Sequence, residues 1–394
     1  MKRRDLIKSG VIAVSAAAVG IAGYKKIEDY NSSSKKMSIS PKQTDVYKIC
    51  TPLPFRFELI DEIENLNSEL KKSQIKILYN NFPYPLSSEF NWQFAAVRGR
   101  NYNINSFDDF ARYVKYAQDK GFNFVYLLNS PKPFSEDDFN KYKKNLFVLL
   151  ENLQSIGCRE IKIANTQLMQ IISKEKMGFK LSASTSFEYH NVSQYVNLIN
   201  TYSSIKSINT AIDDNRNFIF LKNLKRLFPE IDIEVMVNEK CMHGCPARIS
   251  HCASFFEAFP CMTLAEKTGK LKYFLKSNVV YPWQLEYYSA IGINTFKFMS
   301  YPMRADIDNL NFLKNYLMCL ENGINNLTVS DFFNGIFEVG LSHIKNNVKL
   351  SEIMPYLPDM KHFVKNGDRC ANICGIDCNY CIKCAEKIGK IIGV

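Results

Sequence analysis

The sequence predicts an α/β protein: a closed TIM-type (β/α)8 barrel of parallel strands, followed by a small cysteine-rich C-terminal module. From about residue 45, short runs of β-branched and aromatic residues alternate with longer amphipathic stretches, which is the pattern of βα units. Seven or eight units occur, and their strands are apolar on both faces, which favours a parallel sheet covered by helices. A chain of 394 residues can hold such a barrel, which commonly uses about 250 residues. An open doubly wound sheet is the alternative.

The predicted strands are short and separated by helical stretches. They span residues 74–80, 122–128, 160–164, 180–186, 207–211, 232–237 and 295–299. Two helices have clear N-terminal signals, because Ser106 and Ser135 are each followed by acidic residues that suit a side-chain cap and the positive end of the helix dipole. Gly157 is expected to end the second of these helices.

Four segments are predicted along the chain. They are a signal or anchor at 1–23, a flexible tether at 24–44, the barrel at 45–325 and the cysteine-rich module at 326–394. In the module we expect a helical stretch around 328–345, and then a linker marked by Pro355 and Pro358.

The N-terminus resembles a twin-arginine export signal. Arg3 and Arg4 are followed by Leu-Ile-Lys and by an Ala/Gly/Val-rich run over 11–23. This implies recognition by the twin-arginine export machinery and a position in the periplasm or on the outer face of the cytoplasmic membrane. A cut after Ala22 suits the small residues there, and an uncleaved segment would act as an anchor. A basic N-terminus on a short amphipathic helix is the alternative.

Composition excludes two classes of protein. No segment reaches the roughly 20 consecutive apolar residues of a spanning helix, so a polytopic membrane protein is not expected. The formal net charge of +11 is spread along the chain rather than gathered in a block, so it gives little support to nucleic-acid binding, which is not expected of an exported protein.

The cysteines are clustered, which favours metal binding over scattered disulfides. Nine of the twelve lie within residues 241–261 and 370–384. The first group follows a predicted strand, on the face where barrels carry their sites, and its ligand candidates are Cys241, Cys245, Cys252 and Cys261. Four thiolates suit a 4Fe-4S cluster. Zinc, with His243 and His251 nearby, and disulfides are the alternatives.

The second group is more crowded. Its metal candidates are Cys374, Cys378, Cys381 and Cys384, with Cys370 as a further thiol. Local disulfides fit this spacing poorly, and the Cys-x2-Cys-x2-Cys run is similar to that of bacterial ferredoxins. The group therefore predicts a second cluster, with zinc or disulfides as alternatives. The stretch from Cys374 to Cys381 also fits the radical SAM fingerprint, which makes a radical SAM enzyme another candidate, although that motif normally follows the first barrel strand.

Residues 237–252, with His243-Gly244 just before Cys245, resemble the signature of the collagenase-like peptidase family U32. Residues 292–298, followed by Pro302-Met303-Arg304, resemble a second segment of that family. The resemblance covers roughly 45–325. It implies a TIM-type barrel and, where the cysteines are present, a 4Fe-4S cluster. It also implies either peptidase activity or oxygen-independent hydroxylation.

Three other side chains are catalytic candidates because they follow predicted strands: Lys297, Arg304 and His190. Solvated loop charges and an ordinary surface histidine are the alternatives. No Ser-His-Asp order or zinc-protease helix motif occurs. The sequence as a whole predicts an exported iron–sulfur protein that performs a redox-linked, hydroxylation-like modification with an unidentified electron-transfer partner. A peptidase and a non-catalytic protein with zinc or disulfides are the alternatives.

Overall fold

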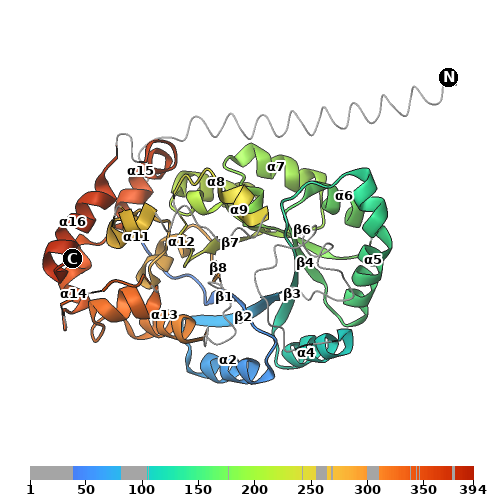
Figure 1. Ribbon diagram of the computed structural model, residues 1–394, viewed down its shortest axis with the longest axis horizontal. Helices are drawn as coiled ribbons and strands as arrows, with labels where there is room; N and C mark the ends of the chain where they lie inside the picture. Colours follow the sequence, from blue (N-terminus) through green and yellow to red (C-terminus); the bar gives the residue numbers. More distant parts are fainter. Residues whose placement is uncertain are drawn as a thin grey trace.

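Eight parallel strands close into a barrel in chain order, with β8 pairing to β1 (Figure 1). The strands are β1 (Tyr47–Pro52), β2 (Ser73–Asn80), β3 (Asn123–Leu128), β4 (Glu160–Ile163), β5 (Lys180–Ala183), β6 (Ile205–Asn209), β7 (Asp232–Met236) and β8 (Thr295–Lys297). The predicted (β/α)8 barrel is therefore confirmed, and the open sheet is excluded.

The computed structural model describes most of the chain. The described residues are 39–80, 104, 106–175, 177–241, 243–253, 264–267, 269–299, 310–337, 339–342, 344–345, 347–374 and 378–394. The predicted signal, most of the predicted tether, Cys261 and Arg304 lie outside them. Of Cys252 and Cys370 the backbone alone is described.

All seven predicted strands are present, and β1 is the eighth, which the strand prediction missed. Its sequence, YKICTP, ends in proline and lacks a clear apolar run. Some predicted ends were too long. The strand expected over 180–186 stops at Ala183 because the hydroxyl of Ser184 caps a short 3-10 turn by accepting from the Ser186 N–H.

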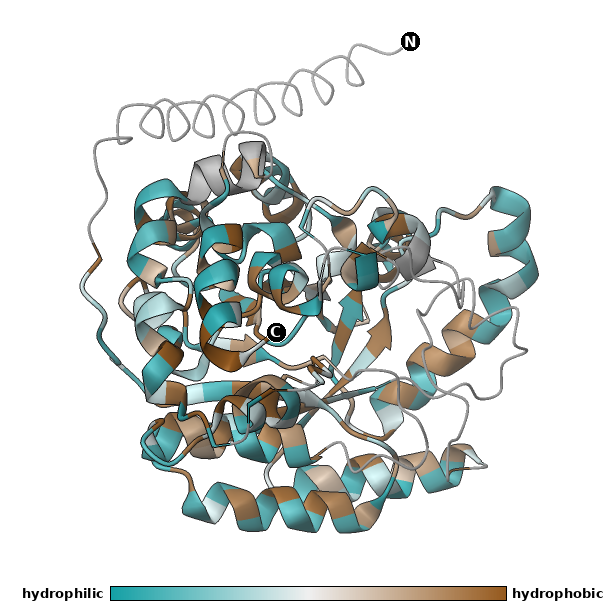
Figure 2. Cartoon of the chain, turned by 60° about the vertical axis from the view of Figure 1, so that its left-hand side comes forward, coloured by the Kyte–Doolittle hydropathy of each residue, from teal (hydrophilic) through white to brown (hydrophobic). Residues whose placement is uncertain are grey.

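Helices surround the barrel and present one apolar face to it, which is visible as alternating hydrophilic and hydrophobic bands (Figure 2). They are α2 (Phe57–Glu69), α4 (Phe107–Asp119), α5 (Glu136–Ser155), α6 (Thr166–Lys174), α7 (Val192–Thr201), α8 (Phe218–Leu227), α9 (Arg248–Ala253), α11 (Lys270–Lys276), α12 (Leu285–Ser289) and α13 (Leu310–Asn322). None of the helices in the described part of the chain has the length and hydropathy of a membrane span.

The predicted helix signals are confirmed. The Ser106 hydroxyl accepts from the Asp109 N–H at 3.1 Å, and Ser135 forms a reciprocal capping box with Asp138. Gly157, the residue after the C-cap of α5, takes a φ of +76°, a conformation that costs other residues steric strain and that ends the helix here.

The C-terminal segment packs on the barrel and shares its apolar core. It contains a π-helical turn over Asp331–Ile336, then α14 (Leu350–Ile353), α15 (Met360–Ile373) and α16 (Tyr380–Ile392). The helix expected over 328–345 is thus limited to residues 329–336, beyond which the Asn334 side chain bonds to the backbone of Leu341. Helix α15 packs against α8, and α16 against α11 (Figure 1).

Candidate metal centre

The last four cysteines lie together where α15 ends and α16 begins. Cys374 caps α15, and a β-bridge pairs it with Cys378. Cys381 and Cys384 follow in the first turns of α16, three positions apart and so on one face of the helix. Electrostatic repulsion from each of the other three thiols raises the pKa of Cys381, so the four cysteines are neighbours. The fold therefore gathers the predicted metal candidates of the second group.

A hollow opens beside these thiols. Three of the four cysteines line it, together with Lys276 of α11 and the stacked rings of His362 and Tyr380, whose centroids are 3.8 Å apart. The Tyr380 hydroxyl also accepts from the Asp359 N–H at 2.9 Å, which ties the start of α16 to the start of α15. The thiols thus adjoin a small space with a cation and aromatic walls.

Arg216 is the most unusual side chain at this site. Its residue is 1% exposed, and Nη2 donates to the Val279 carbonyl at 3.0 Å, but Nε and Nη1 have no partner among the described residues. Burial raises the pKa of Cys381 to about 12, and the nearby Arg216 cation opposes that rise. A buried guanidinium with two unused donors beside four thiols calls for an anionic acceptor.

The first cysteine group lies in the loop after β7, where Asp213 organises it. The Asp213 carboxylate accepts from the Gly244 N–H at 3.0 Å and from Arg248 Nη2 at 2.8 Å. Arg248 also donates to Glu188 at 3.0 Å and bonds to the Cys241 thiol. Although burial opposes it, hydrogen bonds from His243 and Arg248 hold the pKa of Asp213 well below its usual range.

His243 lies between the two cysteine groups. Its Nδ1 is 2.9 Å from Asn278 Nδ2 and 3.3 Å from Asp213 Oδ1. Burial lowers the pKa of His243, but Asp213 and the Cys374 thiol raise it more. Because His243 is in the first group and Cys374 is in the second, the fold brings the two groups to neighbouring positions.

The described thiols lie near one another, but their side chains do not converge on a single point where a metal ion could bind. No three His, Cys, Asp or Glu side chains of the described residues are arranged to hold a metal ion. The nine cysteines whose side chains are described form no disulfide. Of the first group, Cys241 and Cys245 are described, whereas the Cys252 side chain and Cys261 lie outside the described part.

A second group of buried polar side chains lies inside the barrel. Lys162 on β4 donates to Glu234 on β7 and, at 2.9 Å, to Asn209 on β6. Asn209 donates in turn to Glu234 at 3.0 Å. These residues were not among the predicted candidates, although Lys162 and Glu234 each alternate with apolar neighbours in their strands, a signal for inward polar side chains.

Lys297, a predicted candidate, is the last residue of β8 and lies near this network. Its Nζ lies 4.3 Å from the centre of the Tyr79 ring, and this atom makes no hydrogen bond or ion pair with the described residues. Burial and the Lys162 cation lower the pKa of Lys297 to about 7. Its amine is therefore poised between the charged and neutral forms at neutral pH.

His190, another predicted candidate, lies in an acidic setting next to the first cysteine group, where it shares Glu188 with Arg248. Its ring is half exposed, with Nδ1 at 3.0 Å from Asp214 Oδ2 and Nε2 at 3.6 Å from Glu188 Oε2. Hydrogen bonds to Asp214 and Glu188 raise the pKa of His190 to about 10. The imidazole is therefore held in its charged form at neutral pH.

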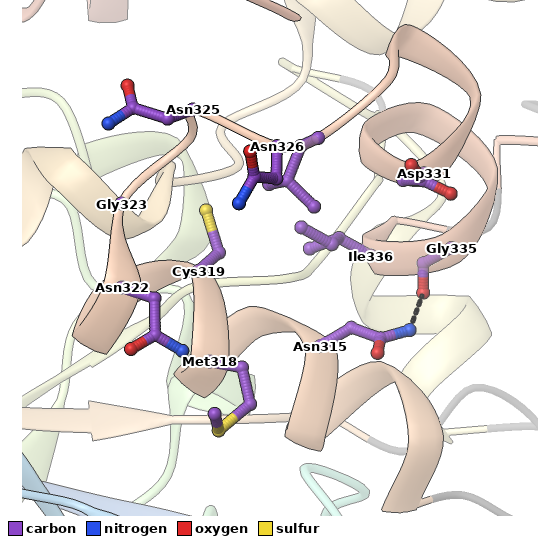
Figure 3. Close-up of a pocket in the computed structure, with 11 residues that line it drawn as sticks. Asn315, Met318, Cys319, Asn322, Gly323, Asn325, Asn326, Asp331, Gly335 and Ile336 are labelled. Carbon is purple, nitrogen blue, oxygen red and sulfur yellow. Dashed lines mark hydrogen bonds between the residues drawn. The ribbon is translucent and has the colours of Figure 1, made fainter.

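A pocket beside α13 lies elsewhere in the fold (Figure 3). Four asparagine side chains, Met318 and Cys319 line it. Its one acidic lining residue, Asp331, is engaged in a turn by accepting from the Thr328 N–H and hydroxyl. The pocket offers hydrogen-bonding groups but no reactive set.

Comparison with known proteins gives one relative in sequence. No family model matches the chain. The protein named "Uncharacterized protease MJ1657" of Methanocaldococcus jannaschii is 21% identical over 349 residues, which cover 84% of this chain and 94% of that protein. The chain is similar in sequence to a protein named as a protease.

Solved structures show lower similarity. The U32 peptidase Mk0906 aligns with a TM-score of 0.42 and 11% identity, covering 67% of this chain and 97% of its own. N-acetylneuraminate lyase from Fusobacterium nucleatum aligns with a TM-score of 0.34 and 11% identity, covering 87% of this chain and 98% of its own.

Proposed function

We propose that this chain is an exported iron–sulfur protein of the U32 peptidase type, which takes part in a redox-linked, hydroxylation-like modification of a substrate. The observation that carries the proposal is the position of Arg216, whose two unused donors are buried beside four thiols. The predicted ligands are Cys374, Cys378, Cys381 and Cys384, and, for a second cluster, Cys241, Cys245, Cys252 and Cys261.

The chemistry of the donors at the C-terminal group supports a 4Fe-4S cluster there. A cubane held by four thiolates is anionic and has sulfur acceptors, which suits the unused N–H groups of Arg216 and the nearby charge of Lys276. Burial raises the pKa of the Cys381 and Cys384 thiols, and ligation to iron would offset that cost by stabilising the thiolates. Such a cluster supplies one-electron transfer when bound.

The chain's own residues would tune that site. Arg216 would donate hydrogen bonds and positive charge, which favour the more negative, reduced state. Phe363 covers one face of the guanidinium, and the His362–Tyr380 stack forms a wall of the hollow, so both limit access of water. An electron-transfer partner would meet the protein near this surface.

The test is iron and sulfide analysis of the full chain, matured and purified without oxygen. We expect at least about four irons per chain, and an electron paramagnetic resonance signal after reduction. Cys381→Ser and Cys384→Ser should lower the iron content, whereas Cys319→Ser on α13 should not. Fewer than about four irons in the folded wild-type protein would contradict the proposal.

Export is a separate part of the proposal and has its own test. The Arg3-Arg4 pair motivates it. Replacing both with lysine should leave the protein in the cytoplasm, while the unchanged chain fractionates with the periplasm or the membrane. Equal distribution of the two proteins would contradict twin-arginine export.

A second candidate function is peptide hydrolysis, which the similarity to a protein named as a protease favours. Incubation with gelatin would reveal it. Cleavage that persists in Cys241→Ser, Cys245→Ser and Cys381→Ser would favour hydrolysis over redox chemistry. Absence of cleavage by the iron-loaded wild-type protein would count against a general peptidase.

A further inference from the structure

The barrel interior is divided into an apolar half and a polar half. The apolar half is a small cluster on β1 to β3, made of Cys50, Ile77, Tyr79, Val125 and Leu127. Across the barrel lie the buried Lys162, Asn209 and Glu234. Lys297 of β8 lies between the two halves. It contacts the Tyr79 ring on one side, and its charge lowers the pKa of Glu234 on the other.

The charges of this interior leave Lys297 without a dedicated partner. The Glu234 carboxylate is bound by Lys162 and Asn209. Three titratable groups shift the pKa of Lys297: Lys162 on β4, Glu234 on β7 and Cys50 on β1. The ring of Tyr79 on β2 faces its Nζ. The Tyr79 hydroxyl is engaged, since it donates to the Phe298 carbonyl.

Two features commonly prepare a lysine for nucleophilic chemistry, and Lys297 has both. The residue is 4% exposed, so its ammonium form is poorly solvated, and a second cation, Lys162, lies nearby. These features agree with the lowered pKa of about 7. Its position at the carboxyl end of a strand is where (β/α)8 proteins hold their reacting groups.

We propose that Lys297 is the nucleophile of a carbonyl-binding site inside the barrel, where it forms an imine with an aldehyde or ketone. This inference is independent of the proposed cluster, because it uses no cysteine ligand. The neutral Nζ attacks the carbonyl carbon, and the C–N bond forms as the carbonyl π electrons move to oxygen. A proton passes from nitrogen to oxygen to give a carbinolamine. Water then leaves as the C=N bond forms, so no oxidant or reductant is required.

Reductive trapping tests the proposal. The full chain is incubated at pH 7 with limiting pyruvate and sodium cyanoborohydride, and adducts are located by peptide mass spectrometry. An amine with a pKa of about 7 is roughly half neutral at this pH, whereas an ordinary lysine is neutral in only about one molecule in 2,500. We therefore expect the adduct, pyruvate less one oxygen atom, mainly at Lys297. Labelling of Lys297 no greater than that of the exposed Lys48 would overturn the proposal.

Two variants separate nucleophilic chemistry from a merely buried charge. Lys297→Arg keeps the cation but cannot form an imine, so the main adduct should disappear. Lys162→Met removes the neighbouring cation and frees Glu234 to pair with Lys297, so the pH at which trapping is half-maximal should rise. Circular dichroism confirms folding of both variants. Trapping with the same pH profile in wild type and folded Lys162→Met would contradict the role given to the two charges, and trapping that persists elsewhere in Lys297→Arg would contradict the site.

Discussion

The guanidinium of Arg216 lies 4.3 Å from the centre of the Phe363 ring. Arg216 belongs to the barrel, just after the short turn Ile212–Asp214, and Phe363 belongs to α15. This contact joins the two parts of the chain, and the charge of the arginine lies close enough to the C-terminal thiols to lower the pKa of Cys381. A buried cation in this position destabilises the folded protein when it has no anionic partner, and an anionic ligand offsets that cost.

Arg216→Met should therefore change the stability of the iron-free protein and the reduction potential of the iron-loaded protein. Without iron, it removes a buried charge with unsatisfied donors, and the free energy of unfolding should rise by about 1 kcal/mol. With a cluster bound, loss of the cation should lower the reduction potential. Urea unfolding and a redox titration measure the two effects. The exposed Arg226→Met on α8 is the control, and an unchanged potential in Arg216→Met would contradict the contact with the cluster.

Arg248→Met should strongly destabilise the protein. The guanidinium bridges Asp213 and Glu188 in a buried position, so its removal leaves two carboxylates short of a partner. We expect a loss of about 3–5 kcal/mol in the free energy of unfolding. Urea denaturation at pH 7 measures this loss, with the exposed Arg159→Met as the control. A loss below about 1 kcal/mol would show that the bridge is dispensable.

The ion pair inside the barrel should respond unequally to its two deletions. Glu234→Gln leaves Lys162 without its carboxylate partner and removes the negative charge that favours the Lys297 cation, so it should cost about 3–5 kcal/mol. Lys162→Met should cost less, about 1–3 kcal/mol, because Lys297 can neutralise Glu234. A double-mutant cycle by urea denaturation gives the coupling between the two residues. Equal costs for the two single variants would argue against compensation by Lys297.

His190→Gln should change how stability depends on pH. The folded state raises the pKa of His190 from 6.5 to about 10, so its contribution is complete below pH 6.5 and is lost as the pH rises to about 10. Because the ring is half exposed, the contribution should stay below about 1 kcal/mol. Unfolding curves at pH 6, 8 and 10 should show the variant losing less stability than wild type over this range. Parallel curves would contradict the ion pairs.

The residues themselves determined the fold to a large extent. Apolar strands at regular intervals gave seven of the eight strands, and the capping serines Ser106 and Ser135 placed the starts of two helices, because both signals act over a few neighbouring residues. The grouping of the cysteines was also evident from their spacing. β1 was missed because its short, proline-terminated sequence becomes a strand through pairing with β2 and β8.

What only the tertiary structure decided is which distant residues share an environment. Barrel closure places Lys162 against Glu234 and leaves Lys297 unpaired beside them, and the packing of α15 on α8 brings Arg216 to the C-terminal thiols. These relationships join residues far apart in the chain, and no local pattern encodes them. Burial then sets their chemistry, because the same lysine or arginine on the surface would be solvated and ordinary.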